Sequence, residues 1–116
     1  MRIAIYENNL LWSVRLANGV TALGHEPEVL TTATAPSSEV QLAILNLGVE
    51  SFRDPGFIQA LHDAHIVTVG HAGHKESDIL RAGREAQCDH VVSNSTLTHK
   101  LADILALRKL PVSADS

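Results

Sequence analysis

The chain has 116 residues, which is enough for one domain with one sizeable core. Hydrophobic residues make up 45% of it and charged residues 19%, proportions that exclude a disordered chain. The net charge of −4 argues against a nucleic-acid surface, and no apolar run approaches the roughly 18 residues of a membrane span. Cys88 is the only cysteine, so no internal disulfide can form. We expect a cytoplasmic protein whose domain contacts neither nucleic acid nor membrane.

The first part of the chain predicts a strand followed by a helix. Residues 3–6 form a compact apolar strand, and either Asn8 or Asn9 can cap the helix that follows. Apolar residues recur near helical spacing over residues 10–23. Gly24 then stands where a helix end favours a left-handed residue.

The next part lacks room for a fully developed second helix. Residues 28–31 predict a weaker strand, and residues 32–38 are rich in Thr, Ala, Ser and Pro, which is typical of a loop. At most one or two helical turns, ending near Gln41, fit before the third strand. That strand, LAILNL at 42–47, is apolar almost throughout, as expected for a parallel strand buried on both faces.

Helices and strands alternate in the second half of the chain. Asp54 and Pro55 can begin a helix, with the aspartate as its cap. Residues 66–69 predict a fourth strand that leads into a loop at 70–74. Another helix follows, and then the short strand 90–92.

A last helix closes the predicted domain. It begins near Thr96 or Thr98, and Pro111 ends it because proline cannot continue a helix. We therefore expect residues 1–110 to form the domain and residues 111–116 to be a tail or linker stub.

The predicted order is strand then helix, repeated about five times, with the second helix short or missing. Short apolar strands joined by helices require right-handed crossovers and a parallel sheet covered on both faces. The predicted fold class is α/β, a doubly wound five-stranded parallel sheet. Function in such sheets gathers at the carboxyl ends of the strands, which here are residues 6–8, 46–48, 70–72 and 93–95.

Four segments, in chain order, carry a resemblance to a known family. They are IAIYENNLLWSVRLANGVTALGHE (3–26), LAILNL (42–47), HIVTVGHAGHKES (65–77) and CDHVVSNSTLTHKLADIL (88–105). Together they resemble the response-regulator receiver domain, the CheY-like module of two-component signalling, over residues 2–108. The first segment corresponds to the receiver's first strand, acidic loop and first helix, and the second to its third strand, which carries the phosphorylated aspartate. The third segment corresponds to the fourth strand with its exit loop, and the last to the fifth strand with the last helix. The resemblance implies a (βα)5 flavodoxin/CheY-like fold.

The chemistry that this resemblance implies is altered at four elements of the site. Receivers phosphorylate an aspartate with the help of a magnesium ion held by acidic residues. Of the acidic pair in the first loop, Tyr6 fills one position and only Glu7 remains, and Asn46 replaces the phosphate acceptor. Gly70 stands in place of the Thr or Ser that senses the phosphoryl group, and Asn94 in place of the Lys. An amide is too weak a nucleophile for phosphoryl transfer, so these residues predict a degenerate pocket without aspartyl phosphorylation.

The same strand ends allow other roles. Asn46 and Asn94 can hydrogen-bond each other, because buried amides need partners, or bind a small polar ligand with Glu7, His71 and His74. The H-A-G-H sequence at 71–74 also invites a metal hypothesis with Glu7 as third ligand. A loop motif lacks the fixed helical spacing that makes such pairs specific, so we predict solvated loop histidines, no metal and no cofactor.

The sequence assembles no catalytic group. Ser93, Ser95 and Thr96 lie at the end of the fifth strand, where His71 can approach them, but neither a nucleophile elbow nor a Gly-rich oxyanion loop accompanies them. The glycines form neither a G-x-G-x-x-G motif nor a P-loop. We therefore do not expect an enzyme.

Two sets of apolar residues are candidates for contacts with a partner. Trp12, early in the first helix, is either a core residue or an exposed anchor. Leu97, Leu101, Ile104 and Leu105 lie in a region that receivers use for dimers and partners, although apolar residues at this spacing are more often core. The resemblance implies a signalling module that acts through protein partners, with a homodimer using the face between the helix after the fourth strand and the last helix. The alternative is a small-molecule or metal-binding domain that uses the strand-end pocket.

Overall fold

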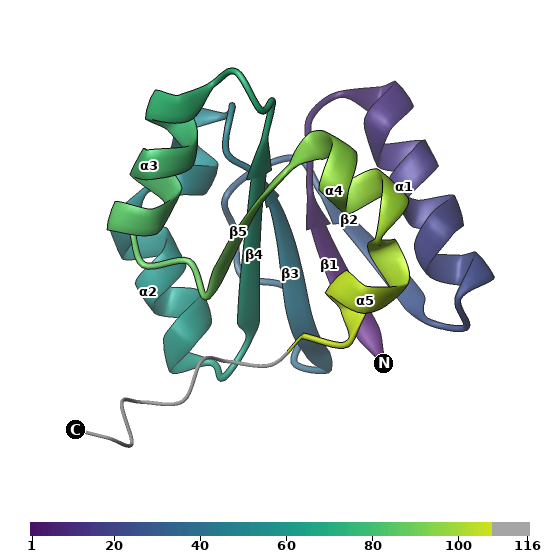
Figure 1. Ribbon diagram of the computed structural model, residues 1–116. Helices are drawn as coiled ribbons and strands as arrows, with labels where there is room; N and C mark the ends of the chain where they lie inside the picture. The colour runs from purple at the N-terminus through teal and green to yellow at the C-terminus, as the bar shows by residue number, and fades with distance from the viewer. Residues whose placement is uncertain (108–116) are drawn as a thin grey trace, which may run out of the picture.

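Five parallel strands form the centre of the protein (Figure 1). The computed structural model describes residues 1–107, and its strands are β1 (Arg2–Tyr6), β2 (Glu26–Leu30), β3 (Val40–Asn46), β4 (Val67–Ala72) and β5 (His90–Ser93). Neighbouring strands pair in parallel in the order β2-β1-β3-β4-β5. The predicted fold class, an α/β domain built on a doubly wound five-stranded parallel sheet, is confirmed.

The strands follow the sequence pattern, with corrections in β2 and β4. β2 was predicted at residues 28–31 and lies two residues earlier at its start, at Glu26–Leu30. β1 and β3 are aliphatic and almost wholly buried, as expected for strands covered on both faces. β4 continues through Gly70 and His71 to Ala72, a segment that the sequence analysis placed in a loop. Neighbours on both sides hold this segment in the sheet, because His71 lies opposite Asn46 and Ala72 lies opposite Ser93.

The first helix, α1 (Leu10–Ala22), begins and ends close to its predicted positions. Its cap is Asn9, whose side chain accepts a hydrogen bond from the Trp12 backbone N–H at 3.0 Å. Gly24 follows the helix with a φ of 85°, a left-handed conformation that residues with a Cβ rarely adopt.

The connection from β2 to β3 contains no helix, in agreement with the prediction of a short or missing second helix. Residues 31–39 form bends and a turn. The connection from β3 to β4 instead contains the 3-10 helix η1 (Glu50–Arg53) and α2 (Pro55–Asp63), which is capped by Asp54 as predicted. One region of the sheet is therefore covered by a loop instead of a helix.

The predicted last helix is two short helices. α4 (Asn94–His99) begins earlier than predicted because the Ser93 side chain caps it. Lys100 interrupts the helical backbone with φ −124° and ψ 34°, and α5 (Leu101–Leu105) follows. The prediction that the helix continues to Pro111 is therefore wrong, because α5 ends at Leu105. Pro111, the predicted domain end at residue 110 and the predicted tail all lie outside the described residues.

Helices cover both faces of the sheet (Figure 1). α1, α4 and α5 pack on one face, and their buried residues there are Leu16, Val20, Leu97, Ile104 and Leu105. α2 and α3 (Ser77–Glu85) pack on the other face, where Phe52, Ile58, Leu61 and Ala86 are buried. Among residues 1–107, no helix is both long enough and apolar enough to cross a bilayer.

β2 forms one edge of the sheet. The Arg2 guanidinium on β1 lies 3.0 Å from a carboxylate oxygen of Glu26 and 3.0 Å from one of Glu28. Pro27 lies between these two glutamates in the strand. Surface ion pairs of this kind contribute little to stability, so burial of the apolar faces is the main stabilising contribution.

Candidate functional site

Four polar side chains meet at the carboxyl ends of four strands. Glu7 follows β1, Asn46 ends β3, His71 lies near the end of β4, and Asn94 follows β5. These strands are neighbours in the order β1-β3-β4-β5, and Asn46 lies directly opposite His71. We call these four residues the strand-end site. All four are among the candidates named from the sequence, and the structure places them at neighbouring strand ends, whereas the fifth candidate, His74, is exposed in the turn after β4.

Asn46 is bound at both ends of its side-chain amide. Its Nδ2 donates to Glu7 Oε2 at 2.8 Å, and its Oδ1 accepts from the Gly48 backbone N–H at 2.9 Å. The Asn9 backbone N–H also donates to Glu7 Oε2, at 3.1 Å. Glu7 is only 1% exposed, so these two donors stabilise a carboxylate that burial would otherwise disfavour. The amide therefore joins the loop after β1 to the turn after β3.

His71 is the second buried member of the strand-end site. It is 3% exposed, and its Nδ1 lies 2.7 Å from Asn94 Oδ1. An amide oxygen only accepts, so Nδ1 carries the proton and Nε2 of the neutral ring is a bare acceptor. Burial lowers the pKa of His71, while the hydrogen bond to Asn94 and the charge of Glu7 oppose that change. The prediction of a solvated loop histidine is therefore wrong for His71.

The predicted hydrogen bond between Asn46 and Asn94 is not formed. Each amide instead binds the titratable side chain next to it, Asn46 to Glu7 and Asn94 to His71. β4 lies between β3 and β5, so the ends of the two asparagine strands are not adjacent in the sheet. The strand order, which the sequence pattern does not determine, decides this pairing.

Two buried atoms of the strand-end site have no hydrogen-bond partner among the described residues. They are Glu7 Oε1 and His71 Nε2. Both are acceptors when Glu7 is ionised and His71 is neutral. Buried polar groups in folded proteins are nearly always paired, so this pair of acceptors is the strongest chemical signal at the strand ends.

The magnesium ion implied by the resemblance does not fit these residues. Mg²⁺ takes oxygen ligands and usually keeps several waters. Glu7 Oε2 and Asn46 Oδ1 already accept hydrogen bonds, and the remaining oxygen, Glu7 Oε1, is buried beside an imidazole. Within residues 1–107, no three His, Cys, Asp or Glu side chains lie together as a metal site. His74 is exposed in the turn after β4, so the hypothesis of a metal held by Glu7, His71 and His74 is wrong.

Tyr6 and Gly70, the other members of the predicted pocket, serve the core on the α2 side. The Tyr6 ring makes edge contacts with Phe52 and Phe57, and its hydroxyl donates to the Thr34 backbone oxygen at 2.6 Å. Burial raises the pKa of Tyr6, so the phenol stays protonated. A Cβ at Gly70 would lie 2.8 Å from the Leu47 methyl groups, which explains why glycine stands there.

The hydroxyl groups after β5 are used in capping. Ser93 Oγ accepts from the Thr96 backbone N–H at 3.1 Å and donates to Thr96 Oγ1 at 3.0 Å. The His71 ring hydrogen-bonds Asn94, and within residues 1–107 no hydrogen bond joins it to Ser93 or Thr96.

The predicted interface residues fall into two groups. Leu97, Ile104 and Leu105 are at most 4% exposed, so they are core residues and the prediction of a contact surface is wrong for them. Leu101 and Trp12 are partly buried against the same core, and the Arg15 guanidinium lies 5.6 Å from the Trp12 ring.

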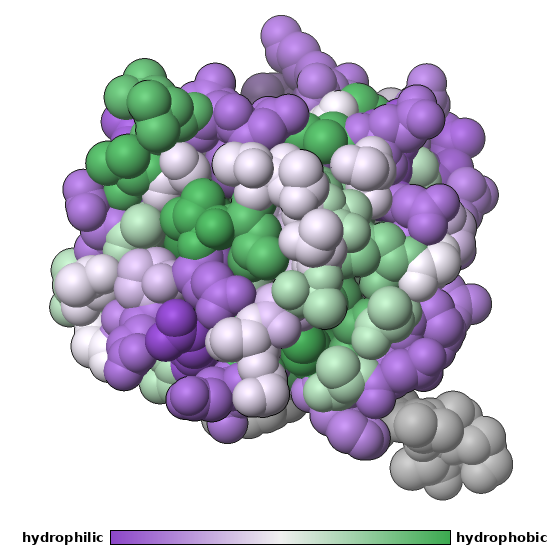
Figure 2. All heavy atoms as spheres, turned by 180° about the vertical axis from the view of Figure 1, so that it is seen from behind, coloured by the Kyte–Doolittle hydropathy of each residue, from purple (hydrophilic) through white to green (hydrophobic). Residues whose placement is uncertain are grey.

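A hydrophobic patch that the sequence analysis missed lies at the N-terminal end of α1. Leu10 and Leu11 are 80% and 81% exposed, and Val14 is 49% exposed. Figure 2 shows hydrophobic side chains gathered over this end of α1, at the upper left. The signal was available, because Leu11 and Val14 lie off the stripe at 13, 16 and 20 that faces the sheet. We call these three residues the α1 patch.

No family model matches the sequence, and no curated protein sequence matches it. Solved structures do match. A response regulator receiver protein from Pseudoalteromonas atlantica is 13% identical, over 91% of this chain and 98% of that chain, with a TM-score of 0.69. A response regulator from Thermotoga maritima is 7% identical, over 91% and 98%, with a TM-score of 0.67. The pilus assembly protein CpaE from Burkholderia thailandensis is 15% identical, over 91% and 95%, with a TM-score of 0.71.

This chain has the receiver fold. The match extends over about nine tenths of the chain, so the CheY-like architecture expected from the sequence is confirmed for the domain as a whole. At these identities the likeness concerns the fold, and the chemistry of the strand-end site has to be argued from its own residues.

Proposed function

We propose that this chain is a signalling or scaffolding module that acts through protein contacts and is not phosphorylated on an aspartate. The observation that carries this proposal is the amide of Asn46, which is hydrogen-bonded at both ends to Glu7 and Gly48. An amide is a poor nucleophile, and this one is also fixed in place. The strand-end site therefore serves as a structural brace between two loops.

The α1 patch supports the protein-contact part of the proposal. Its three side chains expose large apolar surfaces directly after the loop that carries Glu7 and Asn9. Exposed apolar patches commonly mark interaction sites, because burying them in a complex is favourable. CpaE, one of the similar structures, is named as a pilus assembly protein, and the others as response regulators. The receiver fold thus occurs both in proteins named as response regulators and in a protein named as a pilus assembly protein.

A phosphorylation assay tests the first part of the proposal. The protein is incubated with acetyl phosphate and Mg²⁺, and its intact mass is measured, with an active receiver domain as positive control. We expect no mass increase of a phosphoryl group. Stable incorporation of phosphate into the wild-type chain would overturn the proposal.

Partner capture tests the second part. A Leu10→Ser/Leu11→Ser variant should lose a partner that the wild-type chain retains. The matched control is Leu23→Ser, because Leu23 is 42% exposed at the opposite end of α1. Equal capture by all three proteins would remove the α1 patch from the proposal. The partner's identity, the cytoplasmic location and a homodimer remain predictions. Of the residues expected for the homodimer face, Leu101 alone keeps partial exposure.

A second candidate function is binding of a small polar ligand at the strand-end site. It is favoured by the two unpartnered acceptors, Glu7 Oε1 and His71 Nε2, since a ligand with two donors would pair both. Thermal melting against a panel of metabolites tests it, because a ligand at 100 times its Kd stabilises the folded chain by about 2.7 kcal/mol. A shift with the wild-type chain that persists in His71→Gln would count against this site.

A further inference from the structure

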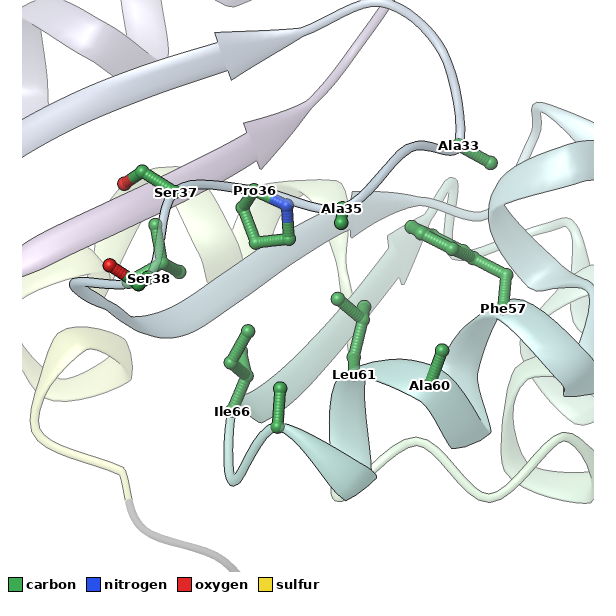
Figure 3. A pocket seen from close by; sticks show the side chains of 11 residues that line it. Ala33, Ala35, Pro36, Ser37, Ser38, Phe57, Ala60, Leu61 and Ile66 are labelled. Atoms are coloured by element: carbon green, nitrogen blue, oxygen red, sulfur yellow. The ribbon is translucent and has the colours of Figure 1, made fainter.

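A cavity lies between the loop at 31–39 and helix α2, where the other connections between strands have a helix (Figure 3). Its volume is ≈ 330 Å³, within the range of small-molecule sites. Phe57, Leu61 and Ile66 point from the α2 side toward the loop, which carries Ala35 and Pro36 (Figure 3). We call it the α2 cavity. It belongs to the face opposite α1 and is separate from the strand-end site and from the α1 patch.

The loop that forms the outer wall is held in place by specific contacts. The Tyr6 hydroxyl donates to the Thr34 backbone oxygen at 2.6 Å, near the start of the loop. The Ser37 backbone N–H donates to Glu28 Oε2 at 2.9 Å, and its carbonyl accepts from the Val40 N–H at 3.2 Å. These contacts fix both halves of the loop, so the cavity has a defined wall.

The side chains that line the cavity leave room because several of them are small. Alanines contribute from both walls, Ala33 and Ala35 from the loop and Ala60 and Ala64 from α2 and its end. A volume of ≈ 330 Å³ lies near the lower end of the range of small-molecule sites, so the cavity fits a compact molecule.

The charges around the cavity restrict its ligand further. None of its eleven lining residues, all within the described part of the chain, is charged. An anion bound there would lose its hydration without a lining cation to pair with it, so a neutral ligand is favoured. Ser37 and Ser38 lie at the end of the cavity away from Phe57, and their hydroxyl groups are directed away from the other lining side chains (Figure 3). The side chains that face the cavity are therefore mainly apolar.

We propose that this cavity binds an uncharged, mainly apolar small molecule, of the size of one or two fused aromatic rings. Pockets with an apolar lining are the usual sites for such molecules. The ligand contacts Phe57 and Leu61. This site does not depend on the proposed protein contacts, so either proposal can fail without the other.

An NMR titration tests the proposal with two matched probes, neutral 2-naphthol and anionic 2-naphthoate. We expect saturable shifts for 2-naphthol, confined to amides of residues 33–40 and 57–66, and binding of 2-naphthoate at least ten times weaker. No saturable shift with 2-naphthol, shifts centred elsewhere, or equal binding of the two probes would each overturn the proposal.

Filled variants locate the site. Ala60→Leu and Ala35→Leu, on opposite walls, should each weaken 2-naphthol binding at least ten-fold. The matched control, Ala22→Leu, changes an exposed alanine at the end of α1 and should bind as the wild-type chain does. The amide spectrum of each variant checks that it is folded. Unchanged binding in both filled variants would overturn the assignment.

Discussion

The strand-end site and the α2 cavity differ in how much of their structure is fixed by specific partners. At the strand-end site, Glu7 and His71 are almost fully buried and each is paired with one asparagine. The cavity instead has small apolar walls, and its alanines at 35 and 60 are exposed. Substitutions should therefore be costly at the first and tolerated at the second. This difference separates a site that supports the fold from one that can accept a ligand.

Among these substitutions, Asn46→Ala should cause the largest loss of unfolding free energy. It removes one of the two donors to Oε2 of the buried Glu7 carboxylate, and a hydrogen bond to a charged group contributes about 1.5–3 kcal/mol to the unfolding free energy. Urea denaturation measures the loss. Asn18→Ala, at an exposed position of α1, is the control. A loss no greater than that of the control would mean that the strand-end site does not support the fold.

Gly70→Ser should have the next largest effect. Its Cβ would lie 2.8 Å from Leu47, which is fully buried, so the core becomes overpacked at a cost of about 1–3 kcal/mol. The same substitution in a Leu47→Ala background should cost less, because the obstructing methyl groups are gone. Equal costs in the two backgrounds, measured by urea denaturation, would remove the packing explanation for this glycine.

The pH dependence of stability should show a smaller effect of His71. Burial lowers the pKa of His71 in the folded chain below the ordinary value of 6.5, so the unfolded chain binds a proton more readily. The contribution of His71 to stability is thus present above pH 6.5 and is lost as the pH falls toward the lowered folded value. Comparing unfolding free energies at pH 8 and pH 5.5 should give a smaller difference for His71→Gln than for the wild-type chain. His74→Gln, at an exposed position of the turn after β4, is the matched substitution for comparison.

Ala60→Leu should have the smallest effect on stability. The residue is exposed and lines an open cavity, so the unfolding free energy should change by no more than about 0.5 kcal/mol. The same urea series measures it beside Asn46→Ala. Comparable losses in the two variants would contradict the distinction between a fixed site and a tolerant cavity.

Much of the fold could be predicted because the deciding signals are local. The cap at Asn9, the left-handed Gly24 and the Asp54-Pro55 helix start depend on residues close in sequence. The loop composition of residues 32–38 likewise indicated that the second helix was missing.

The features that could not be predicted depend on contacts between distant residues. β4 extends to Ala72 because β3 and β5 pair with it, and Asn46 binds Glu7 across 39 positions of sequence. The sequence shows that Leu97 and Ile104 are apolar and spaced along a helix, but it does not show that α1 and the sheet cover them. Which apolar residues stay exposed depends on how the helices are placed over the sheet.

The ion-paired edge strand β2 has a consequence for how partners can bind. The Glu26 backbone N–H and the Leu30 carbonyl both point toward the β1 side, so the alternate residues, Pro27 and Val29, direct their backbone groups outward. Proline has no N–H, which leaves Val29 as the outward donor of β2. A foreign chain could not extend the sheet along this edge with a regular ladder, and the flanking glutamates further discourage aggregation there. A partner that approaches this side would have to recognise side chains.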